Sequence, residues 1–308
     1  MDLSVELCGV RLRNPFVLAA GVLGTSAALL ERVARAGAAA VTSKSCGLLP
    51  RLGHPNPTVI PWEGGLINAV GLANPGATAM VAILREAKAR CAPLGVPVVA
   101  SVFGDVAEAF GEVARVLEEA EPDFYEVNIS CPNVAAEFGS PFAADPVQAA
   151  AATAAVRQVT RRPIIVKLSA NVADVRAVAR AVVDAGADAL AAINTLGPGM
   201  LIDIRARAPV LANGVGGLSG PAIRPVAVRC VYELSATVSV PIIGMGGVSS
   251  GEDAVEMIMA GATAVGVGSA FYYRGMDVLN AMVAEMAAFM DEQGFARVEE
   301  MRGLAHGV

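Results

Sequence analysis

The chain has 308 residues, of which 55% are hydrophobic and 17% are charged, and its formal net charge is −6. Average globular proteins have roughly 25% charged residues, so this chain must bury much of its surface. A large core accounts for such burial, and an interface between subunits is an alternative that stays open. The negative charge argues against a broad nucleic-acid-binding face, which requires clustered lysine and arginine. Small molecules are therefore the expected ligands.

Neither a secretory signal nor a membrane span is expected. The first residues contain no basic segment followed by an apolar one, as a signal peptide would. The longest uncharged run, residues 234–251, contains Pro241 and several glycines, so it cannot form one continuous lipid-facing helix. The five cysteines form no CxxC pair, which indicates reduced thiols and no metal or iron-sulfur site in this chain. We expect a cytoplasmic protein.

The predicted elements begin with a small hairpin, whose strands 3–7 and 10–13 flank Cys8 and Gly9. Short β-branched runs then alternate with alanine-rich helical stretches to the end of the chain, which is typical of parallel strands joined by crossover helices. Eight strands are predicted, at residues 16–20, 39–44, 97–102, 124–129, 163–168, 189–193, 241–244 and 264–268.

A repeated Ala-Gly-Ala motif follows three of the helical stretches, at residues 36–38, 185–187 and 260–262. Glycine at this place suits a left-handed helix cap. The repeated helix-glycine-strand unit favours an α/β fold of the (β/α)8 TIM-barrel type, with the hairpin capping its bottom, and an open doubly wound sheet stays possible. No linker composition divides residues 1–308, so we expect a single domain.

Two connections are too long for simple turns between a strand and a helix: residues 45–75 after the second strand and residues 194–218 after the sixth. Long insertions of this kind are usually lids or binding loops. Both follow the carboxyl ends of strands, where TIM-barrel enzymes have their active sites.

Polar side chains stand where several strands are predicted to end. Lys44 ends the second strand, Asn128 ends the fourth, Lys167 lies on the fifth, and Asn194 with Thr195 follows the sixth. The apolar neighbours of Lys167 predict burial, which is costly unless an anion meets the ammonium group. The alternative is that its stem packs while the ammonium reaches water.

Glycine-rich segments follow the last two strands, at residues 244–247 and 266–269. Glycines let backbone N–H groups approach a phosphate, and these are the loops where TIM barrels usually bind one. The alternative is that they are only tight turns. A dinucleotide motif starting at Gly244 would require glycine at 249, where Ser249 stands, so a mononucleotide is the better prediction.

The thiol of Cys131 lies between two amide side chains, in Asn128-Ile129-Ser130-Cys131-Pro132-Asn133. A free cysteine is usually a small buried hydrophobe, and we interpret the other four cysteines in that way. Cys131 differs because it follows a strand end within a polar loop. A thiol with a pKa of about 8.5 can act as a proton acceptor when partly ionised, and neither His54 nor His306 is well placed to be the base.

Together the segments 42–45, 68–76, 128–133 and 216–221 resemble the class 1 dihydroorotate dehydrogenases, FMN-dependent barrel enzymes of de novo pyrimidine (UMP) biosynthesis. The resemblance covers essentially the whole chain. Segments 217–222 and 244–248 are most similar to class 1B, the NAD-linked catalytic subunit. This class 1B resemblance implies a homodimer that pairs with an electron-transfer subunit. The expected partner subunit carries FAD and a 2Fe-2S cluster, so that the assembly is a heterotetramer.

The resemblance also implies a mechanism, in which FMN accepts hydride from C6 of (S)-dihydroorotate while Cys131 removes the C5 proton. The near alternatives are the fumarate-linked class 1A and an FMN-dependent reductase of free pyrimidines or of dihydrouridine in RNA. A non-enzymatic barrel scaffold would leave Lys44, Cys131 and Lys167 without a joint purpose.

The residue roles that the resemblance implies fall into two sets. The substrate-binding set is Lys44, Asn68, Val70, Gly71, Leu72, Asn128, Asn133, Asn194 and Thr195. The FMN-binding set is Ala20, Gly21, Lys44, Ser45, Asn128, Lys167, Ile193, Gly220, Gly246, Gly247, Gly268 and Ser269. Two positions depart from the family pattern: Ala20 replaces a serine and Ser101 replaces an asparagine, and each change removes one expected hydrogen bond to the flavin.

Overall fold

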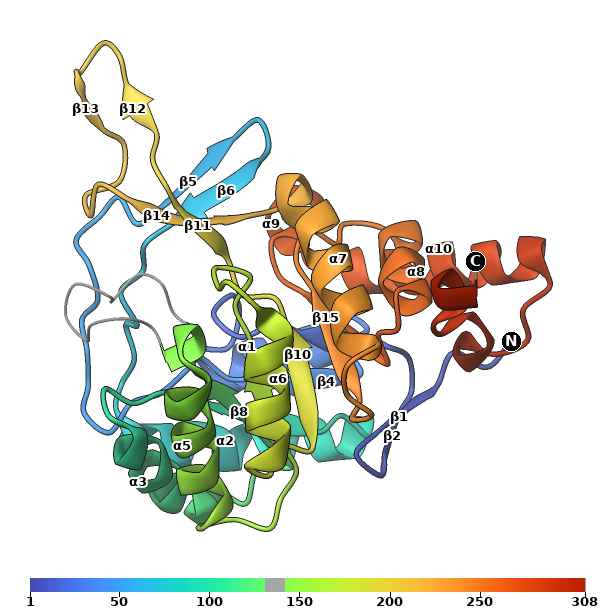
Figure 1. Cartoon of the computed structure of the whole chain (residues 1–308), viewed down its shortest axis with the longest axis horizontal. Coiled ribbons are helices and arrows are strands. Elements are labelled where there is room, and N and C mark those ends of the chain that lie inside the picture. Colours follow the sequence, from blue (N-terminus) through green and yellow to red (C-terminus); the bar gives the residue numbers. More distant parts are fainter. Residues whose placement is uncertain (131–141, 308) are drawn as a thin grey trace.

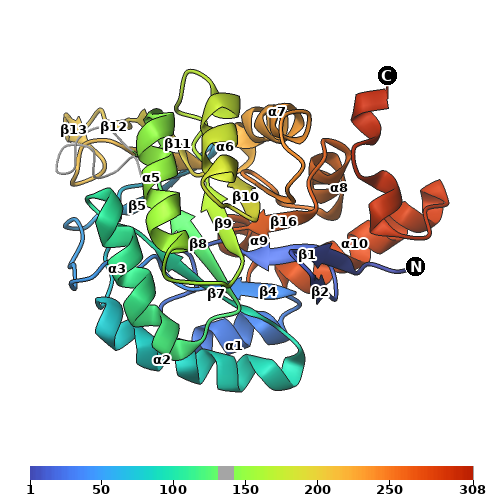
Figure 2. The same cartoon turned by 60° about the horizontal axis from the view of Figure 1, so that its bottom comes forward.

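The computed structural model describes residues 1–130 and 142–307 and contains a closed barrel of eight parallel strands. The strands are β3 (Phe16–Leu18), β4 (Ala40–Thr42), β7 (Val98–Val102), β8 (Phe124–Asn128), β9 (Ile164–Lys167), β10 (Ala189–Ala192), β15 (Ile242–Met245) and β16 (Ala264–Val267). Each lies within a predicted strand or within one residue of it. The predicted TIM barrel is confirmed, and Figures 1 and 2 show helices surrounding it.

Helices follow the barrel strands, and capping residues or glycines mark several of their ends. They are α1 (Ala27–Arg35), α2 (Ala77–Cys91), α3 (Ala107–Leu117), α5 (Pro146–Arg157), α6 (Val175–Asp184), α7 (Arg224–Ser235), α8 (Gly251–Met259), α9 (Ala270–Arg274) and α10 (Val278–Gln293). Helix α8 starts with a capping box formed by Ser250 and Asp253. The predicted glycines that follow α1, α6 and α8 have φ of +110°, +105° and +115°, which disfavours any residue with a side chain.

The bottom of the barrel is closed by the predicted N-terminal hairpin, formed by β1 (Val5–Leu7) and β2 (Val10–Leu12). Leu7 and Leu12 are at most 1% exposed and belong to a cluster with Val99, Phe124 and Ile165 inside the barrel. Successive strand residues point to opposite faces, so the neighbours of these inward residues pack against the helices instead. The lower half of the barrel interior is therefore a solid apolar core.

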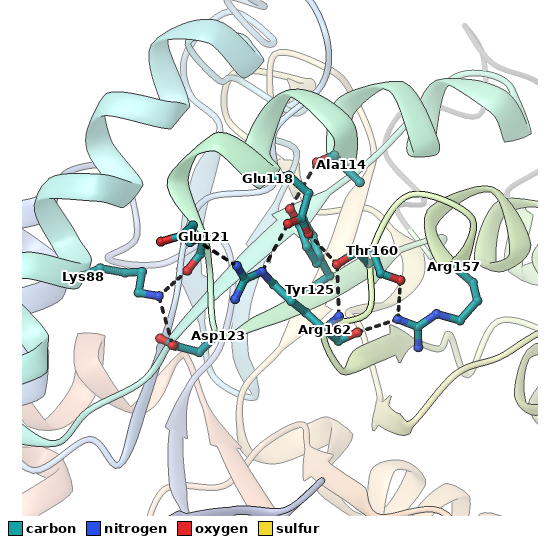
Figure 3. A network of polar contacts seen from close by, with 9 residues as sticks. All are labelled: Lys88, Ala114, Glu118, Glu121, Asp123, Tyr125, Arg157, Thr160 and Arg162. Carbon is teal, nitrogen blue, oxygen red and sulfur yellow. Dashed lines mark hydrogen bonds and ion pairs between the residues drawn. The ribbon is translucent and has the colours of Figure 1, made fainter.

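Polar contacts hold the lower ends of β8 and β9 to the surrounding helices (Figure 3). The Tyr125 hydroxyl donates to the carbonyl of Ala114 in α3 at 3.1 Å, and the Arg162 guanidinium meets the Glu118 carboxylate at 3.3 Å. Thr160 donates to the same carboxylate. This network lies at the end of the barrel where polar residues support stability more often than catalysis.

Both long connections contribute strands to a second sheet, with the order β11-β14-β6-β5. Its strands are β5 (Val59–Trp62), β6 (Gly65–Asn68), β11 (Leu196–Gly199) and β14 (Gly216–Ser219), and a ribbon of β12 (Ile202–Asp203) and β13 (Ala208–Pro209) extends from it (Figure 1). The connections are thus paired with each other and are not simple loops. Gly65 is required here, because a Cβ on it would lie 1.8 Å from the carbonyl oxygen of Ser219.

Within the described part of the chain, no helix is both long enough and apolar enough to cross a membrane.

Candidate active site

A cavity of about 390 Å³ opens at the carboxyl ends of the barrel strands, beside the second sheet. Its volume is within the range of small-molecule sites. Barrel residues supply the floor and one wall, and β6 with residues 70–72 supplies another wall. Both long connections therefore do reach the site, although as parts of a sheet.

Nearly all of the predicted site residues that the structure describes line this cavity. They are Ala20, Gly21, Lys44, Ser45, Asn68, Val70, Gly71, Leu72, Asn128, Lys167, Ile193, Asn194, Thr195, Gly246, Gly247, Gly268 and Ser269. Gly220 is not among the lining residues: its carbonyl oxygen lies 2.7 Å from where a Cβ on Gly247 would be, so it sits directly behind the glycine-rich wall. Cys131 and Asn133 lie outside the described residues.

The amide of Asn128 is oriented by hydrogen bonds from two sides. Its Nδ2 donates to Oγ of Ser45 at 3.0 Å, and its Oδ1 accepts from Oγ of Ser130 at 3.2 Å. Nδ2 of Asn194 donates in turn to Oγ of Ser130 at 2.9 Å. The ends of β4, β8 and β10 and the residues just after them thus present a connected row of hydroxyl and amide groups, which suits a planar ligand with several ring donors and acceptors.

Lys167 is 5% exposed and meets a buried carboxylate that the sequence interpretation overlooked. Glu126 is 3% exposed, and its Oε1 lies 3.9 Å from the Lys167 ammonium nitrogen. The expected anion is thus supplied in part by the protein itself. The signal was present in the sequence, because Glu126 is two residues before Asn128 and strand alternation sends both inward.

Ser101, the second departure from the family pattern, takes part in this buried network. Its Oγ donates to Oε1 of Glu126 at 2.9 Å and contacts Oγ of Ser45 at 2.8 Å. The position therefore joins Glu126 to the row of polar groups that includes Asn128.

The second sheet forms the other side of the cavity. Asn68 on β6 donates from Nδ2 to the carbonyl oxygen of Gly217 on β14 at 3.2 Å. A Cβ on Gly217 would lie 2.2 Å from Oγ1 of Thr195, so the absence of a side chain lets β14 lie against the segment after β10. Sequence reasoning missed Val59, Leu66 and Ser219, which also line the cavity, because their places depend on how this sheet folds over the barrel. It also missed Tyr272, which lines the cavity from helix α9.

The glycine-rich end of the cavity has little room for side chains. Gly246 and Gly247 have φ of +126° and +78°, and a Cβ on Gly246 would lie 2.9 Å from the Cβ of Ala227. Gly246 and Gly247 both line the cavity, so this end presents glycine backbone, which suits phosphate binding. The loop is held in place by Asp253, whose carboxylate accepts from the N–H of Ser249 at 2.8 Å.

The described cysteine thiols are poor bases, which leads to a testable prediction. Burial raises the pKa of the thiols of Cys8 and Cys46 to about 12 and that of Cys91 to about 11, and it also raises the pKa of Cys230. Since the thiolate is the reactive form, a thiol reagent at pH of about 8 should label one of the five cysteines in the native protein. Mass spectrometry should find the label on Cys131.

The control for this labelling is the denatured protein, in which all five cysteines should react. A second native thiol that reacts as fast as Cys131 would contradict the interpretation that burial makes the other four cysteines unreactive.

The fold and the site define a TIM-barrel enzyme whose cavity joins a glycine-rich, phosphate-type end to an amide- and lysine-lined end. The sequence profile of dihydroorotate dehydrogenase matches residues 2–290. The chain belongs to the dihydroorotate dehydrogenase family, whose members are oxidoreductases and generally depend on flavin.

Three relatives show how similar the chain is to named proteins. The dihydroorotate dehydrogenase B (NAD(+)) catalytic subunit of Methanosarcina mazei is 48% identical over 305 residues, which cover 99% of this chain and 95% of the relative. Its counterpart from Methanothermobacter thermautotrophicus is 46% identical, with 99% and 98% coverage. That from Pyrococcus furiosus is 41% identical over the full length of both chains.

Proposed function

We propose that this protein is the FMN-containing catalytic subunit of an NAD-linked dihydroorotate dehydrogenase, which oxidises (S)-dihydroorotate to orotate in pyrimidine biosynthesis. The observation that carries the proposal is the cavity in which Lys44, Asn68, Asn128 and Asn194 converge beside Lys167 and the glycine-rich wall. Orotate offers several ring donors and acceptors and one carboxylate, which matches three amides and a lysine. The names of the relatives support the same substrate and acceptor.

FMN fits the donor set of the cavity. Gly246, Gly247 and Gly268 line the cavity together with Ser269, and backbone N–H groups of such a glycine-rich segment suit a phosphate. The buried ammonium of Lys167 suits the flavin ring edge that becomes negative on reduction. When bound, FMN supplies the hydride acceptor that no amino-acid side chain can provide.

The chain's own residues supply the remaining chemistry. Cys131 removes the proton from C5 of dihydroorotate as the hydride leaves C6, so that two C–H bonds break and a C5–C6 double bond forms. The substrate loses two electrons, which NAD receives at the end of the transfer. Asn68, Asn128 and Asn194 hold the ring, and the ammonium of Lys44 balances the negative charge of the substrate.

A partner subunit is part of the proposal, because the relatives are named catalytic subunits. A separate chain carrying FAD and a 2Fe-2S cluster would pass electrons to NAD, with this chain as a homodimer at the centre of a heterotetramer. The reduced thiols that we expect here fit a cytoplasmic location.

We expect the purified protein to be yellow and its flavin to bleach when dihydroorotate is added without oxygen. Absorbance spectroscopy during an anaerobic titration tests the cofactor and the substrate together, because the flavin bleaches only if FMN is bound and dihydroorotate reduces it. One equivalent of substrate should reduce one equivalent of FMN. Protein that stays colourless after incubation with FMN would refute the proposal.

The acceptor is measured in the same preparation. Reduced FMN in the chain alone should be reoxidised slowly by NAD, and a candidate partner subunit should accelerate this reoxidation. Efficient turnover of the isolated chain with fumarate would instead assign the protein to the class 1A enzymes. Reduction by dihydrouridine but not by dihydroorotate would favour the reductase alternative.

A further inference from the structure

We propose that Glu126 is a positioning residue that fixes the ammonium group of Lys167 and offsets part of its positive charge, so that the reduction potential of the bound flavin is kept low. The inference rests on the proposed function, because it assumes that flavin binds next to Lys167. It assigns a role to a buried carboxylate that does not itself line the cavity.

The register of the barrel places Glu126 between two strands that matter for the site. It pairs with Ser101 on β7 and with Ile165 on β9, and Asn128 pairs with Lys167 two residues further along. The alternation along β8 sends Glu126 to the same interior face as Asn128. The carboxylate therefore lies one layer below the residues that line the cavity, above the apolar core formed by Phe124 and its neighbours.

A carboxylate buried at this depth needs compensation, since an isolated buried charge is strongly unfavourable. Glu126 has a hydrogen bond from Ser101 at 2.9 Å and an ion pair with Lys167 at 3.9 Å. The backbone N–H of Ser101 also donates to Oγ of Ser43 at 3.2 Å. The Ser101 side chain is held by Oγ of Ser45 at 2.8 Å, and its hydrogen bond to Glu126 fixes the position of the carboxylate.

The sign of the effect follows from the charges. Reduction by a hydride adds negative charge to the flavin, so a nearby ammonium group favours the reduced state. A fixed carboxylate behind that ammonium group cancels part of its field, and the cancellation is large because the pair is shielded from water. Glu126 therefore makes the flavin a stronger reductant, which favours passing electrons onward to a nicotinamide acceptor.

The test is the midpoint potential of the FMN-loaded Glu126→Gln variant, measured anaerobically by equilibration with a reference dye. Glutamine keeps the length and an acceptor oxygen for Ser101 but removes the charge. We expect the ratio of reduced-FMN to oxidised-FMN affinity to rise at least about tenfold, which corresponds to about 30 mV for a two-electron couple. Glu126→Asp, whose carboxylate lies farther from the ammonium group, should give a smaller rise.

The matched control is Tyr125→Phe, one residue away on the same strand. Its hydroxyl points to the opposite face and bonds to Ala114 in α3, so its loss should leave the potential unchanged. An equal shift in this variant would mean that any disturbance of β8 alters the flavin, and the inference would be overturned. The aspartate variant tests the same point if the glutamine variant does not fold.

The outcomes also separate the two proposals. A wild-type protein that fails to bind FMN would overturn both. A wild-type protein that binds FMN and is reduced by dihydroorotate, with no shift in Glu126→Gln, would overturn the role of Glu126 alone.

Discussion

Replacement of Cys131 by serine is expected to slow the reduction of bound FMN by dihydroorotate by about 10²- to 10⁴-fold, the usual contribution of a positioned general base. A serine hydroxyl has nearly the shape of the thiol but ionises far less readily, so it accepts the C5 proton poorly. Stopped-flow absorbance under anaerobic conditions measures the rate directly. The affinity for orotate, followed by the change that it causes in the flavin spectrum, should change only a few-fold.

Cys8→Ser is the matched control for this substitution. The Cys8 thiol lies in the hairpin at the bottom of the barrel and donates to the carbonyl oxygen of Asp188 at 3.5 Å, a bond that serine can also form. The rate of FMN reduction by dihydroorotate in the Cys8→Ser variant should equal that of the wild type. A Cys131→Ser rate within a few-fold of wild type would remove Cys131 from the mechanism and leave the base to be found elsewhere.

The barrel could be predicted from the sequence because its strands are local features. Each is a short, mainly apolar run buried on both faces. Each helix-to-strand turn after α1, α6 and α8 carries a glycine that must adopt a positive φ. The polar residues of the site could be predicted for a related reason. The carboxyl ends of parallel strands meet at one end of a barrel, so Lys44, Asn128 and Asn194 converge wherever they stand in the chain.

The second sheet could not be predicted in the same way. Strand β14 pairs Gly217 with Asn68 on β6, although the two residues are far apart in sequence, and β11 contains Gly197 and Pro198. Glycine and proline are depleted in strands, so the local pattern there indicates a loop. Pairing across the two connections decides the structure.

Glu126 shows a different limit of the sequence. Its position before Asn128 indicates that its side chain points into the barrel, but which charge it meets depends on the register between β8 and β9. A shift of the register by two residues would remove Glu126 from the reach of Lys167 without changing the hydrophobic pattern. The direction of a side chain is thus readable from the sequence, whereas its partner is not.

Lys167→Met should lower the free energy of unfolding by about 3–5 kcal/mol, the usual cost of removing one partner from a buried ion pair. Methionine fills the volume of the lysine stem but leaves the Glu126 carboxylate buried without its cation. Urea denaturation of the FMN-free protein gives the free energy without the contribution of cofactor binding. The double variant Lys167→Met, Glu126→Gln should recover most of the loss, because no unpaired charge remains.

Lys88→Met is the comparison that makes this result specific. Lys88 pairs with Asp123 at 3.2 Å near the start of β8, but both side chains are about a third exposed, so its loss should cost less than about 1 kcal/mol. If Lys167→Met costs no more than Lys88→Met, the buried pair does not stabilise the barrel. The double variant could recover its stability without recovering FMN binding. This outcome would separate two roles of Lys167, which balances the charge of Glu126 in the folded barrel and contacts the flavin in the loaded enzyme.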